Sequence, residues 1–412
     1  MITGSKFSNI SAVILLLIVC LPSVGLAEKS ALSLPIEGLE STVLEEVAPG
    51  DYRILFEGQP LERMTGAEFP ALRNLEIKIQ NKNLREMQAD RTINALLIAM
   101  ARIADEPTLI YLHELYESYP ERRNDVAEAI SWYARENQRR DADWRILVRS
   151  LNMVEGEQAK AVMKTLTKFR RRSNKAQWIR QAILVGLKQD AEGQQLASDL
   201  LEHWTGKQLT QLSGEKQTPM LIWQNWFAET YPDELAATLP VEAKDSRWKF
   251  QELQSDLRKR SKKSFDLKLG EKAYVKATCV KCHRYGKLGE KVGPDLTHVS
   301  RRLQRKEIMQ ATIFPSHFVS EEYPTYTIIT EAGKVLTGMM GAAGPDQIML
   351  LTNEGTKQLI NKDEVDEIIP VKKSSMPEGL LNLLTKEEAI QLFGYLTTLP
   401  EGASQAYRHT TR

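Results

Sequence analysis

Apolar residues recur with the period of an amphipathic helix over residues 91–204. Ile93, Leu96 and Met100 occupy the i, i+3 and i+7 positions, which lie on one side of a helix. Similar stripes follow along the rest of this segment, which therefore predicts a series of helices. We expect seven of them, with centres near Leu97, Leu112, Ile130, Val148, Thr165, Ile183 and Leu200.

The predicted helices are evenly spaced along the chain. Successive centres are 15 to 18 residues apart, so a pair of helices recurs about every 35 residues. This period is typical of an α-solenoid, in which each helix pair covers the apolar face of the next pair. Residues 91–204 resemble degenerate HEAT-type repeats. An ordinary bundle of helices of similar length is the alternative.

The pattern changes in residues 265–400. Helices are expected over 267–278, 300–311 and 386–398, and residues 320–371 between the last two are rich in β-type runs. Turn sequences separate these runs, so we expect a small β-meander or a partly open barrel. The expected strands cover residues 323–330, 335–340, 348–351, 357–360 and 365–370. The predicted fold class is mainly α, with a β-rich insert in the C-terminal domain.

The remaining segments show less regularity. Residues 28–90 have no clear pattern beyond a short strand near Tyr52–Phe56 and a helix near Ala71–Glu86. Residues 205–264 are expected to form a connector, which ends in the basic run Arg258–Lys263 and marks a domain boundary. Residues 401–412 form a tail.

The first 27 residues are typical of a secretory signal peptide. Lys6 precedes the apolar run Ile10–Leu21, which is too short to span a membrane, and Gly25–Ala27 fits a small-x-small cleavage site. We therefore expect a periplasmic or secreted protein with no membrane span after cleavage. An uncleaved anchor is an alternative, and a lipoprotein attached through Cys20 is a weaker one because bulky Val19 precedes that cysteine.

Cleavage leaves two cysteines in the mature chain. Of the three in the sequence, Cys20 departs with the signal peptide, and Cys279 and Cys282 remain. Two thiols exclude a zinc site with four cysteine ligands. Because His283 directly follows the second cysteine, the spacing is that of a c-type haem attachment sequence. A redox-active or structural disulfide between the two cysteines stays open as an alternative.

The order of these three residues has a chemical reason. Each cysteine sulfur adds to one vinyl group of the porphyrin, and the short turn keeps both on one haem edge. His283 can then bind the iron through a ring nitrogen. The second axial ligand should be a thioether or an imidazole. Candidates after the attachment sequence are His298, Met309, His317, Met339, Met340, Met349 and Met376.

Three features resemble class I cytochromes c. The loop Gly293–Leu296 holds Pro294, and in those proteins a proline of this kind of loop directs its carbonyl to the axial histidine. Met376 lies in a proline-bearing loop before the last helix, where they present their methionine; Met339, Met340 and Met349 lie in expected strands and are expected in the core. Gly270 with Tyr274, and Gly394 with its neighbours, match the close crossing of their first and last helices.

Residues from about 270 to 400 resemble the haem-binding domain common in planctomycete and verrucomicrobial secreted proteins. The resemblance is carried by CVKCHRYGKLGEKVGPDL, SHFVSEEYPTYTIITEAGKVLTGMM and SSMPEGLLNLLTKEEAIQLFGYL. It implies that Cys279 and Cys282 attach one haem c, and that His283 and Met376 are its axial ligands. The expected fold is then an α-solenoid followed by a cytochrome c-like domain. HEAT-like repeats often precede this domain in such proteins.

The expected function is single-electron transfer, not catalysis, since His/Met ligation fills both axial positions of the iron. Residues 257–306 carry 16 Lys or Arg and 4 Asp or Glu, a basic rim that favours an acidic redox partner, for example a separate periplasmic dehydrogenase. Nucleic acid is not expected as a partner. The alternatives are a haem enzyme or gas sensor with a displaceable distal ligand, and a non-haem scaffold with a Cys279–Cys282 disulfide.

Overall fold

The computed structural model describes residues 33–36, 39–48, 51–81, 86–136, 140–209, 218–260, 264–317, 323–352 and 355–400. The expected signal peptide and the tail 401–412 lie outside these ranges. Helices predominate in the described residues, which confirms a mainly α protein. None of the described helices is long and apolar enough to cross a membrane. The chain divides into two compact units, one up to residue 117 with 122–172, the other comprising 118–121 and the residues from 173 onward.

The first unit begins with a four-stranded antiparallel sheet in the order β1-β2-β3-β4. Its third strand is the strand expected near Tyr52–Phe56, whereas the sequence showed no clear signal for the other three. The strands are β1 (Ser33–Ile36), β2 (Leu39–Ala48), β3 (Asp51–Phe56) and β4 (Gln59–Pro60).

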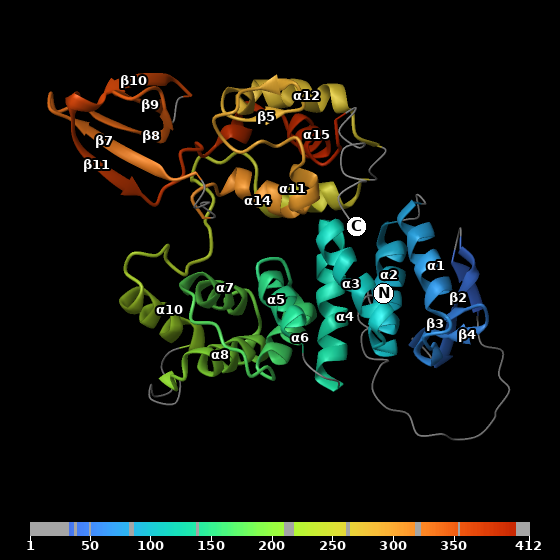
Figure 1. Ribbon diagram of the computed structural model, residues 1–412. Helices are drawn as coiled ribbons and strands as arrows, with labels where there is room; N and C mark the ends of the chain where they lie inside the picture. Colours follow the sequence, from blue (N-terminus) through green and yellow to red (C-terminus); the bar gives the residue numbers. More distant parts are fainter. Residues whose placement is uncertain are drawn as a thin grey trace, which may run out of the picture. The chain divides into compact units, whose positions relative to one another are not determined.

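Six α-helices follow the sheet among the described residues of the first unit (Figure 1). They are α1 (Phe69–Asn81), α2 (Glu86–Ile103), α3 (Glu106–Ser118), α4 (Arg123–Glu136), α5 (Asp141–Ser150) and α6 (Gly156–Leu166). All seven predicted centres lie inside helices, the last two in α7 (Ala176–Gly186) and α8 (Ala191–Thr205) of the second unit. The predicted stripe on α2 is buried, since Ile93, Leu96 and Met100 are each 0% exposed.

Alternate helices of the first unit are linked to one another. Glu128 of α4 accepts hydrogen bonds from Asn94 of α2, at 2.9 Å, and from Gln158 of α6, at 2.8 Å. On the other set of helices, His113 of α3 lies 2.7 Å from Asp143 of α5. Helices α2, α4 and α6 thus form one row, and α3 and α5 are joined in a second.

The second unit contains eight α-helices among its described residues. Besides α7 and α8 they are α10 (Pro219–Thr230), α11 (Phe250–Arg258), α12 (Leu267–Lys276), α13 (Val299–Arg302), α14 (Arg305–Ile313) and α15 (Lys386–Leu396). The single helix expected over 300–311 is thus two. Gln304 starts the second one, where its N–H donates to Glu307 Oε2 at 2.9 Å in a capping box.

The segment expected to be a connector contributes to the core of the C-terminal domain. Phe250, Leu253 and Leu257 of α11 are buried in the same cluster as Tyr274 of α12 and Phe393 of α15. The indole of Trp248 also donates to the carbonyl of Leu384 at 3.1 Å. The core of this domain therefore begins near residue 247, earlier than the boundary at 264 that the basic run indicated.

Helices α12 and α15 lie side by side (Figure 1), and Gly270 of α12 packs tightly against α15. A Cβ atom at this position would lie 2.5 Å from the carbonyl oxygen of Gln391 and 2.5 Å from Cβ of Tyr395. Glycine is therefore required there, as the predicted crossing of the first and last helices implies. Tyr274, one turn later, is fully buried and its ring centre lies 6.1 Å from that of Tyr395.

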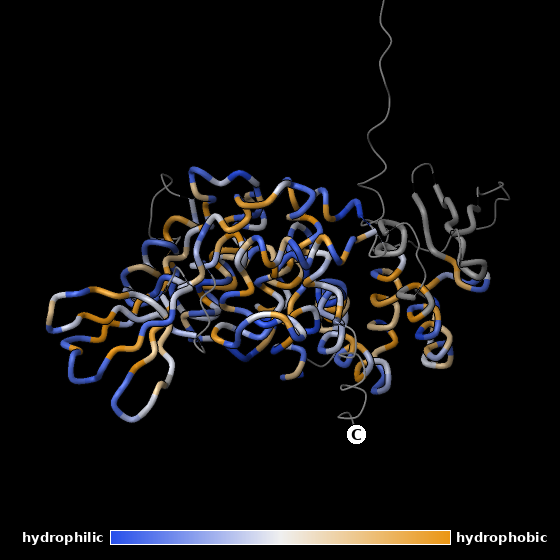
Figure 2. Tube along the Cα trace, turned by 90° about the horizontal axis from the view of Figure 1, so that it is seen from above, coloured by the Kyte–Doolittle hydropathy of each residue, from blue (hydrophilic) through white to orange (hydrophobic). Residues whose placement is uncertain are grey.

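Five strands form an antiparallel sheet in the order β10-β9-β8-β7-β11. They match the five expected strands and are β7 (Thr325–Thr330), β8 (Val335–Ala342), β9 (Gln347–Thr352), β10 (Lys357–Asn361) and β11 (Val365–Val371). Figure 2 shows hydrophobic stretches along these strands and hydrophilic turns between them. Ile328, Leu350 and Ile360 form a small core on one face. The opposite face carries Met339 and Leu351, which are register partners.

Candidate functional site

The attachment sequence follows directly on α12. This helix ends at Lys276, and Thr278 then adopts a left-handed conformation with φ of 61°. Residues Cys279–Lys281 form a single 3-10 turn, in which the N–H of Cys282 donates to the carbonyl of Cys279 at 3.2 Å, and the N–H of His283 donates to the same carbonyl at 2.9 Å. The turn therefore brings the histidine back toward the first cysteine.

A short loop is hydrogen-bonded to this turn and holds it in place. The N–H of Gly293 donates to the carbonyl of Cys282 at 2.8 Å, and the N–H of Glu290 donates to that of Val280 at 3.1 Å. Gly293 lies so close to the imidazole that a Cβ atom there would be 2.9 Å from His283 Cε1. The loop thus fits against the histidine ring only because residue 293 has no side chain.

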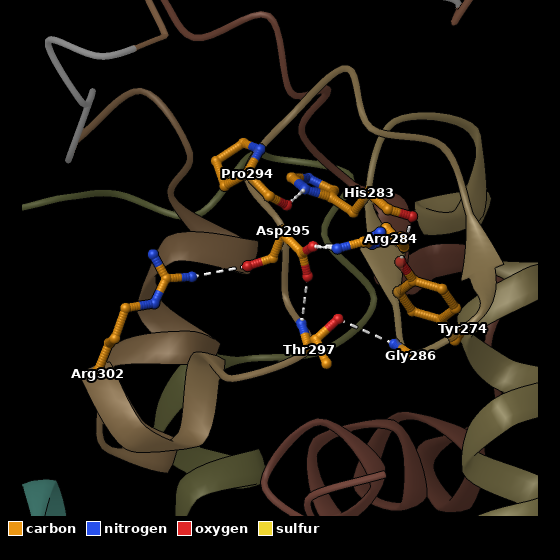
Figure 3. A network of polar contacts seen from close by, with 8 residues as sticks. All are labelled: Tyr274, His283, Arg284, Gly286, Pro294, Asp295, Thr297 and Arg302. Carbon is orange, nitrogen blue, oxygen red and sulfur yellow. Dashed lines mark hydrogen bonds and ion pairs between the residues drawn. The ribbon is translucent and has the colours of Figure 1, made fainter. Parts of the chain in front are cut away.

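His283 is oriented by the carbonyl of Pro294 (Figure 3). Its Nδ1 lies 2.8 Å from that oxygen, so the Nδ1–H is the donor and Nε2 retains its lone pair. Burial lowers the pKa of His283, and the hydrogen bond to Pro294 opposes this effect in part. The ring is therefore neutral at physiological pH, which is the state needed to bind a metal through Nε2. The expected role of Pro294 agrees with this geometry.

Asp295 fixes the loop that carries Pro294 (Figure 3). Its carboxylate accepts hydrogen bonds from the guanidinium of Arg284, with Nε at 2.8 Å, and from the N–H of Thr297 at 2.8 Å. Burial would raise the pKa of Asp295, but these hydrogen bonds outweigh it and lower the pKa to about 2. Arg302 of α13 donates to the carbonyl of the same residue at 2.7 Å. The loop is thereby held from both sides.

A cavity of about 550 Å³ opens beside the histidine. All five predicted site residues line it: Cys279, Cys282, His283, Pro294 and Met376. The rest of the lining is largely apolar and includes Leu296, Val299, Leu303, Ile308, Leu380 and Leu392. Its volume lies within the range of about 300–1,000 Å³ usual for cofactor pockets.

The residues around this cavity fit a c-type haem. Two thiols stand beside one imidazole whose Nδ1 is already engaged, and a thioether sulfur is available as a soft second ligand. Apolar side chains from α14 and α15 would cover a porphyrin. The donor set is less suited to a redox disulfide, because burial raises the pKa of Cys279 to about 12 and also raises that of Cys282.

Met376 is held in its loop by hydroxyl groups. Its N–H donates to Ser374 Oγ at 3.1 Å, and the hydroxyl of Ser375 shares a 2.8 Å hydrogen bond with that of Thr325 on β7. The N–H of Ser374 donates to Ser316 Oγ at 3.3 Å. The methionine loop is therefore tied both to the sheet and to the residues that follow α14.

Of the seven candidates for the second ligand, two line the cavity: Met376 and Met339. Met339 was expected to lie in a strand and to pack in the core. It does lie in a strand, β8, but it lines the cavity. The other five lie elsewhere. His298 is exposed before α13, His317 contacts Arg180, Met309 is buried in the helical core, Met340 packs in the sheet core, and Met349 is the register partner of Gly341.

Several contributors to the site were not identified from the sequence. Leu351 and Thr352 of β9 and Gly355 before β10 line the cavity, and the hydroxyl of Tyr274 donates to the carbonyl of His283 at 2.6 Å. Lys357 of β10 also forms a 2.9 Å ion pair with Glu290, which lies in the loop that is hydrogen-bonded to the Cys279–Lys281 turn. The β-rich insert is thus part of the wall of the cavity.

Comparison with known proteins adds nothing to this description, since no family model matches the chain and no curated protein matches it. Within the described residues, no group of three or more His, Cys, Asp or Glu side chains is arranged to hold a metal ion.

Proposed function

We propose that this protein is an exported c-type cytochrome that carries single electrons through one covalently attached haem. In this proposal Cys279 and Cys282 form the two thioether bonds, and His283 and Met376 are the axial ligands. The observation that carries the proposal is that these four residues line one largely apolar cavity, in which Pro294 engages Nδ1 of the histidine. When bound, the haem would supply an iron that gains and loses one electron.

Each residue has a defined task in this proposal. Pro294 accepts the Nδ1–H of His283 and so keeps the ring neutral and aimed through Nε2. Met376 offers a neutral sulfur, which favours ferrous iron and raises the reduction potential. The apolar side chains exclude water, which limits the rearrangement of solvent when the charge changes. With both axial positions filled, substrate has no open site, so we do not propose an enzyme.

We propose further that the helices between residues 91 and 204 are HEAT-like repeats that dock a redox partner. The linkage of α2, α4 and α6 in one row and of α3 and α5 in another supports a repeating arrangement of helix pairs. The resemblance of residues 270–400 to the haem-binding domain of secreted proteins supports export and a separate dehydrogenase as partner. The basic residues between 257 and 306 would favour an acidic docking face.

A reduced-minus-oxidised visible spectrum tests the proposal. The full-length chain should be produced in a host with cytochrome c maturation machinery. We expect sharp α and β bands, no shift on adding carbon monoxide, and a haem that resists extraction with acidified acetone. The Cys279→Ala/Cys282→Ala variant is the matched control and should lose the haem on extraction.

Two results would replace the proposal with its alternatives. A shift of the wild-type spectrum with carbon monoxide would indicate an open or displaceable distal site, as in a haem enzyme or gas sensor. Absence of any haem signal would leave a non-haem scaffold with a Cys279–Cys282 disulfide.

A further inference from the structure

Two thioether side chains line the same cavity, and only one of them has a role in the proposed site. Met376 reaches the cavity from the loop before α15, and Met339 reaches it from strand β8. His/Met ligation uses a single sulfur. The second sulfur therefore needs an explanation, because a leucine at residue 339 would fill an apolar wall equally well.

Thr325 connects the strand that carries Met339 with the loop that carries Met376. Thr325 is the register partner of Met339 across β7 and β8, so both side chains lie on the same face of the sheet. Directly paired residues have Cβ atoms about 4.5–5.5 Å apart. The Thr325 hydroxyl lies 2.8 Å from that of Ser375, the residue before Met376. One buried threonine thus links the strand of one methionine to the loop of the other.

A row of paired residues that runs across the sheet through Met339 is attached at both ends to other parts of the domain. Thr325, Met339, Leu351 and Lys357 are successive register partners across four strands. Thr325 is only 1% exposed, and Lys357 is paired with Glu290 at 2.9 Å. Both ends of the row are therefore attached, which keeps Met339 between them at the cavity.

We propose that Met339 is a reserve iron ligand that occupies the sixth position when Met376 leaves it. The inference rests on the proposed function. One neutral sulfur donor would replace another, so the bond from iron to Met376 breaks, the bond to Met339 forms, and no electron or proton is transferred. Withdrawal of the methionine loop, for example when a partner docks, would then leave the iron six-coordinate and closed to carbon monoxide and peroxide.

The neighbouring methionines provide matched controls. Met349 lies on the same face as Met339, on the adjacent strand, but does not line the cavity. Leucine has a similar volume to methionine and no sulfur, so it removes only the ligand. The useful variants of the full-length haem protein are Met376→Ala, Met376→Ala/Met339→Leu, Met376→Ala/Met349→Leu and Met339→Leu.

The measurement is the red charge-transfer band of thioether bound to ferric iron, together with carbon monoxide binding to the ferrous form. Covalent haem content, measured as the pyridine haemochrome, and the thermal melt establish that each variant is loaded and folded. We expect Met376→Ala and Met376→Ala/Met349→Leu to retain the sulfur band and to resist carbon monoxide. Met376→Ala/Met339→Leu should lose the band and bind carbon monoxide readily.

Other outcomes overturn the inference in recognisable ways. If Met376→Ala alone loses the band and binds carbon monoxide as readily as Met376→Ala/Met339→Leu, Met339 is not a reserve ligand. If Met339→Leu alone abolishes the band, Met339 is the resident ligand and the assignment of Met376 is wrong. If the wild-type protein contains no covalent haem, the proposed function itself has failed.

Discussion

The hydroxyl of Tyr274 donates a 2.6 Å hydrogen bond to the main-chain carbonyl of His283. A fully buried side chain of α12 thus holds the backbone of the residue that would bind iron. Tyr274→Phe removes the donor and leaves the carbonyl without this partner, which should lower the free energy of unfolding by about 1–3 kcal/mol. Urea denaturation of the full chain measures the loss. Tyr326→Phe, on β7, controls for removal of a tyrosine hydroxyl and should have the smaller effect.

Replacement of Met376 by histidine should lower the reduction potential. Imidazole is a stronger donor to ferric iron than a thioether, so Met376→His favours the oxidised state while it keeps the iron six-coordinate. A fall on the order of 0.1–0.3 V would fit the span of roughly 0.8 V open to axial-ligand choice. Voltammetry measures it, with Met349→His as the control away from the cavity. An unchanged potential would argue against ligation by Met376.

Gly293→Ala should disturb His283, the proposed iron ligand. The added methyl group would lie 2.9 Å from His283 Cε1, so the ring or the loop has to move and the hydrogen bond to Pro294 is strained. We expect a loss of about 1–3 kcal/mol in stability and altered magnetic-resonance signals of the bound histidine. Pro294→Ala keeps the accepting carbonyl and should change these signals less. The reverse order would contradict the proposed role of the loop.

Acid should weaken the second unit through His317. Burial, followed by the nearby charges of Arg180 and Lys188, lowers the pKa of His317 to about 4. In the unfolded chain the group titrates near its ordinary value of about 6.5. Between these values the unfolded state binds the proton more strongly than the folded state does. The free energy of unfolding therefore falls as the pH drops from about 6.5 to 4, and the contribution of His317 is constant above pH 6.5.

The test of this pH dependence compares two proteins. Thermal melts at pH 4.5 and pH 7 should show a larger loss in the wild-type chain than in His317→Gln, because glutamine does not titrate. Carboxylates elsewhere contribute equally to both proteins. Equal losses would show that His317 does not couple to folding.

Truncation should reveal α11 as part of the C-terminal domain that we propose to bind haem. A fragment of residues 265–400 lacks Phe250, Leu253 and Leu257, each of which stabilises the core by about 1.5–3 kcal/mol when buried. A fragment of residues 240–400 retains them and the hydrogen bond from Trp248 to Leu384. We expect the longer fragment to be clearly more stable in urea and to retain haem after mild proteolysis. Equal stability would restore the boundary near residue 264.

The helices and the short turn that carries the two cysteines could be predicted because their signals are local. The stripe that contains Ile93 and the motif that ends in His283 need only neighbouring residues to be recognised, and both have the predicted local form. The five strands were predicted for the same reason. The break before Gln304 was missed, because the capping box that starts α14 lies inside an otherwise continuous helical pattern.

What could not be predicted depends on contacts between distant segments. Phe250, Leu253 and Leu257 have the spacing of a buried helix face, but that spacing does not say what covers it, and the basic run after it indicated a linker. The alternation on β8 separates Met339 from Met340, yet it does not say which face meets the cavity. That depends on long-range contacts of the sheet, such as those of Thr325 with Ser375 and of Lys357 with Glu290.

The antiparallel pairing of β7 with β11 explains how the two proposed ligands, His283 and Met376, can lie far apart in the sequence and still line one cavity. Thr325 and Val371 are register partners, so the insert leaves and re-enters the domain at one point. Excision of residues 325–371 would shorten the 93-residue stretch from His283 to Met376 to about half. The entropy of closing a loop changes by only about 0.6 kcal/mol for each doubling of its length. Insertions into the sheet would therefore add little to the entropic cost of returning Met376 to the histidine's cavity, as long as Thr325 still contacts Ser375.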